Sequence, residues 1–138
     1  MTKGLQAGLL YGIAPYVKAA TPTKYRTALI GCGWWGMNIL REAMAADRAK
    51  VVGLSDVYER PLLVSQDEVN QLTGDTPNIY KDYRELLKKE RPEIVIIATP
   101  DHWHALPCID ALKIGAHVYV EKPTSHTIDE SRSMLHAA

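Results

Sequence analysis

A glycine-rich turn is the first feature of the sequence that could bind a ligand. The segment Gly31-Cys32-Gly33-Trp34-Trp35-Gly36 has the spacing G-x-G-x-x-G and lies between an apolar run and a helical pattern. In such a turn the first glycine permits a tight reversal, the second admits a pyrophosphate, and the third permits close helix–strand packing. Free N–H groups at the start of the following helix attract an anion. The turn therefore predicts a site for the phosphates of a dinucleotide.

An acidic residue stands where a ribose would lie. Asp56 follows a second apolar run, 20 positions after Gly36 (56 − 36), and can accept hydrogen bonds from an adenosine ribose. Asp56 favours NAD because it repels a 2′-phosphate, whereas Arg60 could receive that phosphate, so NADP stays open as a second cofactor. The alternative is a glycine turn kept only for packing, with Asp56 as a helix cap. We expect Trp34 and Trp35 to be partly exposed at the cofactor mouth.

Two further polar segments follow apolar runs. Thr99-Pro100-Asp101-His102-Trp103-His104 follows Ile94–Ala98, and Glu121-Lys122-Pro123 follows the next apolar run. A lysine held between a strand end and a proline, and partly desolvated, can have its pKa lowered toward the range useful for proton exchange. The alternative is a surface lysine paired with Glu121. Lys122 is therefore the candidate catalytic residue.

The sequence does not predict a metal site or a disulfide scaffold. His102 and His104 form an H-x-H pair, but no acidic or cysteine residue stands at ligand spacing, and hydrogen bonding around a ribose explains them better. Cys32 and Cys108 lie 76 positions apart (108 − 32) without partners at zinc-ligand spacing.

The elements that position these residues alternate between strand and helix patterns. This alternation predicts an α/β fold with a doubly wound parallel sheet. Ligands of such sheets bind at the carboxyl ends of the strands, which is where the polar segments fall. The expected strands are Ala28–Ile30, Val51–Leu54, Ile79–Tyr80, Ile94–Ala98 and Val118–Val120. The expected helices are Gly36–Ala46, Pro61–Leu72, a helix capped by Asp82 that runs through Glu90, Trp103–Ile114 and Ile128–Ala137.

Composition excludes several classes of partner. The 138 residues include 16 Lys+Arg and 16 Asp+Glu, so the formal net charge is zero. Without a basic excess or a long Lys/Arg run, the sequence predicts no binding to nucleic acid. No apolar stretch reaches the roughly 20 residues that a membrane-spanning helix needs. The sequence therefore predicts no membrane span.

The N-terminal residues differ in character from the rest. Residues 1–23 contain one early lysine, an interrupted apolar stretch and then small residues. They fit either a weak export signal that leads to the periplasm or an N-terminal arm of a cytoplasmic protein. Residues 24–138 are the expected dinucleotide-binding domain.

The succession GCGWWG, SDV, ATPDHWH and EKPTSHT resembles the N-terminal domain of the Gfo/Idh/MocA oxidoreductases, from about Tyr25 to Ala138. The resemblance implies an NAD(P)-binding Rossmann domain of an enzyme that transfers hydride between a nicotinamide and a sugar or polyol hydroxyl. It places Lys122 beside the nicotinamide, in binding and proton transfer, with Glu121 in the same motif. It also places Ala98–His104 along the cofactor cleft, with Thr99, Pro100 and His104 as cofactor-binding residues.

The resemblance also implies what accompanies this domain. Family enzymes carry a second α/β domain with the substrate pocket, so this chain is expected to be a fragment truncated before that domain and to turn over no sugar alone. The full-length protein could also form a homo-oligomer. One alternative is a non-catalytic cofactor-binding or redox-sensing module. Another is a methyltransferase that binds S-adenosylmethionine, which the pyrophosphate-type turn disfavours.

Overall fold

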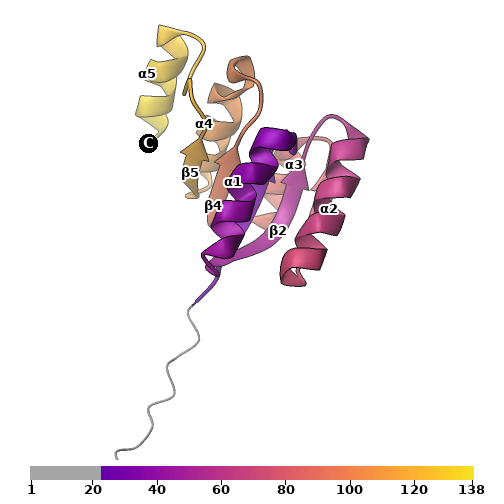
Figure 1. Cartoon of the computed structure of the whole chain (residues 1–138). Coiled ribbons are helices and arrows are strands. Elements are labelled where there is room, and N and C mark those ends of the chain that lie inside the picture. The colour runs from indigo at the N-terminus through magenta and orange to yellow at the C-terminus, as the bar shows by residue number, and fades with distance from the viewer. Residues whose placement is uncertain (1–22) are drawn as a thin grey trace, which may run out of the picture.

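The computed structural model describes residues 23–138. Residues 1–22, which carry all but the last residue of the expected arm or export signal, lie outside the described residues, and the boundary at Lys24 stays a prediction. Five parallel strands form one sheet in the order β3-β2-β1-β4-β5 (Figure 1). They are β1 (Tyr25–Ile30), β2 (Ala49–Ser55), β3 (Asn78–Tyr80), β4 (Ile94–Ile97) and β5 (His117–Val120). This is the doubly wound α/β fold that the sequence predicts.

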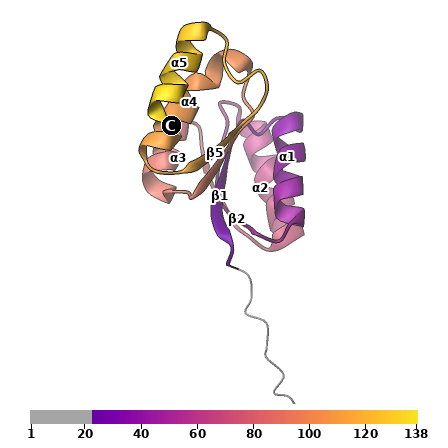
Figure 2. The same ribbon diagram turned by 90° about the vertical axis from the view of Figure 1, so that its left-hand side faces the viewer.

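Helices cover both faces of the sheet. Helices α1 and α2 lie on one face, and α3, α4 and α5 lie on the other (Figure 2). The helices are α1 (Trp34–Ala45), α2 (Glu59–Thr73), α3 (Tyr83–Glu90), α4 (Ala105–Lys113) and α5 (Ile128–Ala137), and a short 3-10 helix, η1 (Asp101–Trp103), precedes α4. In the sheet, β2 and β3 lie on one side of β1, whereas β4 and β5 lie on its other side. The strand order therefore reverses between β1 and β4, where doubly wound sheets bind ligands.

Alternating side chains of the buried strands build two apolar clusters. In β1, Leu29 packs toward α1 and α2, whereas Ala28 and Ile30 pack toward α3 and α4. Both clusters are made of residues less than a tenth exposed. Because both faces of β4 and of the end of β1 are covered, β4 and residues 28–30 of β1 are continuous apolar runs, as is typical of parallel sheets.

Two helices begin with side-chain caps that the sequence allows. The Asp82 carboxylate accepts a hydrogen bond from the Arg84 N–H at 2.9 Å, which confirms the expected cap of α3. At α5, Thr127 and Glu130 form a reciprocal capping box, in which each side chain accepts from the other residue's backbone N–H. These caps satisfy donors that a helix start leaves free.

Element boundaries differ from expectation where exposed residues extend an element. Strand β1 begins at Tyr25, since the Tyr25 N–H donates to the Arg48 carbonyl oxygen at 2.7 Å even though its side chain is exposed. Helix α1 begins at Trp34, two residues before the expected Gly36, because the Met37 N–H already donates to the carbonyl oxygen of Gly33, the N-cap of the helix. The expected helix over Trp103–Ile114 is divided: an i→i+3 bond from the His104 N–H to the Asp101 carbonyl closes η1 before α4 begins.

Among the helices of residues 23–138, none is both long and apolar enough to cross a bilayer. Within the same residues, no three His, Cys, Asp or Glu side chains are grouped so that they could hold a metal ion.

Candidate functional site

A cleft of about 580 Å³ opens at the carboxyl ends of β1, β2, β3 and β4. Its volume lies within the range of small-molecule and cofactor sites. Four separate stretches of the chain reach it, each directly after a strand. The lining residues are Ile30, Gly31, Gly33, Ser55, Asp56, Val57, Tyr58, Lys81, Asp82, Tyr83, Arg84, Ala98, Thr99, Pro100, His102, Trp103 and Pro107.

The first and third glycines of the turn are required by packing. Gly31 has φ +94°, and a Cβ there would lie 2.7 Å from the backbone of Ala98 and Thr99. A Cβ on Gly36 would lie 2.0 Å from the Gly31 carbonyl oxygen. Both distances are below any van der Waals contact, so these positions bring α1 and β4 close to the end of β1.

The second glycine faces open space instead. A Cβ on Gly33 would meet no protein atom within 4 Å, and Gly33 is the N-cap of α1 without a side-chain cap. The Met37 N–H donates to the Gly33 carbonyl at 3.1 Å, so α1 starts directly at the cleft. A helix start of this kind presents N–H groups and a partial positive charge. The absence of a side chain at Gly33 leaves room for an anion against that helix start.

Asp56 is fixed in orientation by two backbone N–H groups. Its Oδ2 accepts from the Cys32 N–H at 2.8 Å, and its Oδ1 accepts from the Tyr58 N–H at 2.9 Å. The carboxylate thus joins the glycine turn to the loop after β2. Each carboxylate oxygen has a further lone pair that can accept a hydroxyl donor from the cleft.

Both cysteines are poor nucleophiles. Burial, with the nearby Asp56 charge, raises the pKa of the Cys32 thiol to about 12. Burial also raises the pKa of the Cys108 thiol. Because the thiolate is the reactive form, neither residue suits thiol redox chemistry at neutral pH.

Thr99 and Pro100 form the opposite wall of the cleft, whereas His104 lies behind it. The side chain of His104 is 1% exposed, and its Nδ1 and Nε2 lie 2.7 and 2.8 Å from the backbone carbonyl oxygens of Pro123 and Thr99. Both ring nitrogens are occupied, so the direct hydrogen bond from His104 to a ribose that we expected is not supported by the geometry. Its contacts connect two loops instead.

Glu121 and Lys122 lie at the end of β5, next to the start of α1. The Glu121 carboxylate accepts from the Trp35 indole N–H at 2.5 Å and from the Lys122 backbone N–H at 2.8 Å. The Lys122 N–H, followed by the Trp35 indole, lowers the pKa of Glu121. Lys122 makes no ion pair among residues 23–138. The expected alternative, an ion pair between the two side chains, does not form.

The structure revises the surroundings expected for Lys122 and confirms those expected for the two tryptophans. Lys122 is exposed, so the partial desolvation expected of it is not present in this chain. Trp34 is 77% exposed and Trp35 is 45% exposed, with ring centroids 5.4 Å apart. The exposure expected of both tryptophans is confirmed. Together with Lys122 they lie beside the cleft rather than in its lining.

One stretch of the cleft lining, which contains Lys81, Tyr83 and Arg84, was not predicted from the sequence as part of the site. Lys81, Tyr83 and Arg84 follow β3 and line the cleft near Asp56. The signal that could have found them is the rule used for the other segments, since they follow a strand, but β3 has only three residues. Arg60, the cation expected near the ribose, is exposed on α2 and is not part of the lining.

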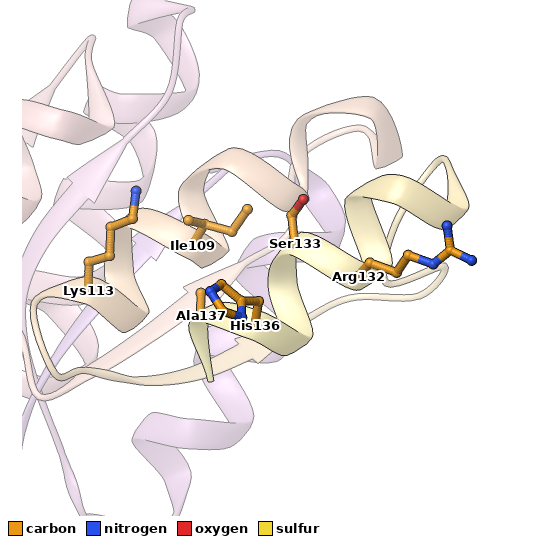
Figure 3. A pocket seen from close by; sticks show the side chains of 6 residues that line it. All are labelled: Ile109, Lys113, Arg132, Ser133, His136 and Ala137. Atoms are coloured by element: carbon orange, nitrogen blue, oxygen red, sulfur yellow. The ribbon is translucent and has the colours of Figure 1, made fainter.

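A second hollow lies between α4 and α5, away from the strand ends (Figure 3). It contains Lys113, Arg132 and His136 beside apolar Ile109 and Ala137. Two of its cations already have partners on their own helices, because Lys113 lies 3.8 Å from Asp110 and Arg132 lies 3.2 Å from Asp129. None of the residues singled out in the sequence lies there.

Comparison with known proteins identifies the family. The profile of the Gfo/Idh/MocA group, described as an oxidoreductase family with an NAD-binding Rossmann fold, matches residues 25–138. The chain belongs to this oxidoreductase family, and the matched residues are its NAD-binding Rossmann domain. The resemblance seen in the sequence motifs is confirmed.

This chain spans about a quarter to a third of the length of the curated relative and the solved structures described below. Glycosyl hydrolase family 109 protein 1 of Akkermansia muciniphila is 33% identical over 111 residues, which cover 78% of this chain and 23% of the relative. The WlbA dehydrogenase of Chromobacterium violaceum, solved with NADH and UDP-GlcNAcA, has TM-score 0.69 and 28% identity and is matched over 86% of this chain and 33% of its own. The Bordetella pertussis WlbA dehydrogenase has TM-score 0.73 at 24% identity over 86% of this chain and 34% of its own, which supports the fold.

Proposed function

We propose that this chain binds NAD with the pyrophosphate at Gly31, Gly33 and the start of α1, and with the adenosine ribose at Asp56. The observation that carries the proposal is the open space at Gly33, set between two glycines that packing requires. Packing alone explains Gly31 and Gly36 but gives no reason for a glycine at the second position. A bound pyrophosphate explains a glycine at the second position, since its oxygens must come close to the backbone.

Cofactor choice follows from the fixed carboxylate of Asp56. Its oxygens can accept from two ribose hydroxyls but repel a 2′-phosphate, so we predict about tenfold tighter binding of NAD than of NADP. Lys81 and Arg84, which line the cleft, oppose this preference but are already paired with Glu59 at 3.7 Å and Asp82 at 3.4 Å.

Calorimetry with NAD and NADP measures the preference. The variant Asp56→Asn should reduce the preference for NAD over NADP, because it removes the negative charge that repels the 2′-phosphate. Asp67→Asn, an exposed carboxylate of α2 away from the cleft lining, is the matched control and should not change it. Tighter binding of NADP than of NAD by the unmodified chain would contradict the prediction and show that Lys81 and Arg84 outweigh the repulsion by Asp56.

In the whole protein, we propose that Lys122 serves hydride transfer between the nicotinamide and a sugar or polyol hydroxyl. Bound NAD would accept the hydride of the carbinol C–H. The Lys122 amine would take the hydroxyl proton, for which it must be neutral before the step. Glu121 accepts from the Lys122 backbone N–H and from Trp35, which fixes the direction of the loop that carries the amine. The sugar class is supported by the UDP-GlcNAcA complex of the 28% identical dehydrogenase.

A second candidate is the cleavage of a glycosidic bond with the help of a bound dinucleotide. The observation that favours it is the name of the 33% identical relative, a family 109 glycosyl hydrolase. Some glycosidases depend on NAD. Such a reaction would leave no net reduced cofactor, whereas a dehydrogenase accumulates it. The non-catalytic redox-sensing alternative, where it relies on a thiol, is not favoured by the buried cysteines.

We predict that this chain alone binds NAD without turnover of either kind. Positioning of reacting groups accounts for roughly 7–11 kcal/mol of such barriers, and Lys122 is exposed beside an open cleft. The test incubates the chain and NAD with inositols, aldoses, polyols and nitrophenyl glycosides while absorbance follows reduced cofactor and nitrophenol. Accumulation of reduced cofactor by the unmodified chain, but not by Lys122→Ala, would contradict the prediction and favour dehydrogenase activity. NAD-dependent nitrophenol release without accumulation would contradict it and favour the glycosidase.

A further inference from the structure

The buried ring of His104 bridges the loops that leave two neighbouring strands. Thr99, whose carbonyl lies 2.8 Å from Nε2, follows β4. Pro123, whose carbonyl lies 2.7 Å from Nδ1, follows Lys122 after the end of β5. Both described contacts of the ring are made to backbone carbonyl oxygens, and one of them, that of Thr99, belongs to a residue that lines the cleft. One side chain thus holds the wall of the cleft and the loop of Lys122 together.

The two partners of the ring belong to different loops. Both are backbone carbonyl oxygens, which accept hydrogen bonds and donate none. Thr99 lies five residues and Pro123 lies 19 residues from His104 in the sequence. A side chain that reaches only one of these carbonyl groups would therefore release the other loop.

We propose that His104, whose ring bridges two backbone carbonyl oxygens, is a positioning residue for the nicotinamide half of the site. It holds the Lys122 loop at a fixed place relative to Thr99, without touching the cofactor. This inference rests on the proposed NAD site. The adenosine half, at Gly33 and Asp56, is assembled by contacts that do not involve His104. Loss of the bridge should therefore affect the nicotinamide half alone.

The first test follows the bridged loop in the unmodified chain. On titration of ¹⁵N-labelled protein, the backbone amides of Lys122 and Thr124 should shift with NAD and should not shift with ADP-ribose. The amide of the exposed His117 is the internal reference and should shift with neither ligand. Equal shifts of Lys122 and Thr124 with both ligands would overturn the proposal.

The second test separates the two halves of the cofactor. Calorimetry compares NAD with ADP-ribose, which lacks the nicotinamide, in the full chain and in His104→Gln. The variant should weaken NAD binding about fivefold, the effect of losing one net hydrogen bond, and leave ADP-ribose binding unchanged. His117→Gln is the matched control and should change neither affinity. Thermal unfolding of each variant confirms that it is folded.

The outcomes distinguish this inference from the proposed function. If the unmodified chain binds neither ligand, the NAD site and the inference both fail. If it binds both, and His104→Gln weakens them equally or not at all, His104 has no positioning role while the NAD site stands. Should His104→Gln not fold, the amide spectra of the unmodified chain decide the question: shifts of Lys122 and Thr124 with NAD alone are expected, and equal shifts with ADP-ribose would overturn the proposal.

Discussion

Replacing Gly33 by Val should weaken NAD binding about 100-fold, equivalent to about 2.7 kcal/mol, and leave the fold intact. The valine side chain would meet no protein atom near its Cβ, since nothing lies within 4 Å. It would instead occupy the space in which we place the pyrophosphate, against the start of α1. Calorimetry measures the affinity, and thermal unfolding measures the stability.

The matched control is Gly74→Val, at another glycine whose Cβ would meet nothing within 4 Å. Gly74 ends α2 with φ +75°, so valine there should lower stability without reducing NAD affinity. The two variants thus separate an effect on the site from an effect on the fold. Unchanged affinity in Gly33→Val would remove the glycine turn from the site.

Replacing Gly36 by Ala should destabilise the protein by about 3 kcal/mol or more. The new Cβ would lie 2.0 Å from the Gly31 carbonyl oxygen, a backbone atom that cannot move without displacing the end of β1. Alanine in a helix gains roughly 1 kcal/mol over glycine, which is too little to offset such a clash. Urea unfolding followed by circular dichroism measures the difference.

Gly33→Ala is the matched control, because it introduces the same atom three residues earlier in the same turn. Its stability should stay within about 1 kcal/mol of the unmodified chain, since the added methyl group meets no neighbour. Equal stability of Gly36→Ala and Gly33→Ala would contradict the packing role assigned to the third glycine.

The fold was predictable from the sequence because buried parallel strands and helical spacing leave distinct apolar patterns. The apolar run Ile94–Ala98 predicted β4, an interior strand that ends at Ile97. The residues of α3 agree with the predicted helix. The predicted boundaries of helices and strands were wrong where hydrogen bonds extend an element through exposed residues. Tyr25 and Trp34 are exposed, so periodicity carries no sign that β1 and α1 begin there.

The candidate site was predictable as far as the positions after strands, and less so in the contacts made there. Gly33 and Asp56 meet in one cleft as expected. The role of His104 was not predictable, since its two carbonyl partners, one of them 19 residues away, are chosen by the packing of loops. Likewise, the pairing of Glu121 with the Trp35 indole joins residues 86 positions apart and has no local signature.

The central claim is that NAD binds at the glycine turn and Asp56, and backbone amide spectra of the ¹⁵N-labelled chain test it most directly. On titration with NAD to millimolar concentration, we predict saturable shifts of the amides of Gly31–Gly36, Asp56 and Thr99. The amides of α5 and of the hollow beside it should not move. Shifts confined to that hollow, or no shifts at all in a folded sample, would contradict the claim.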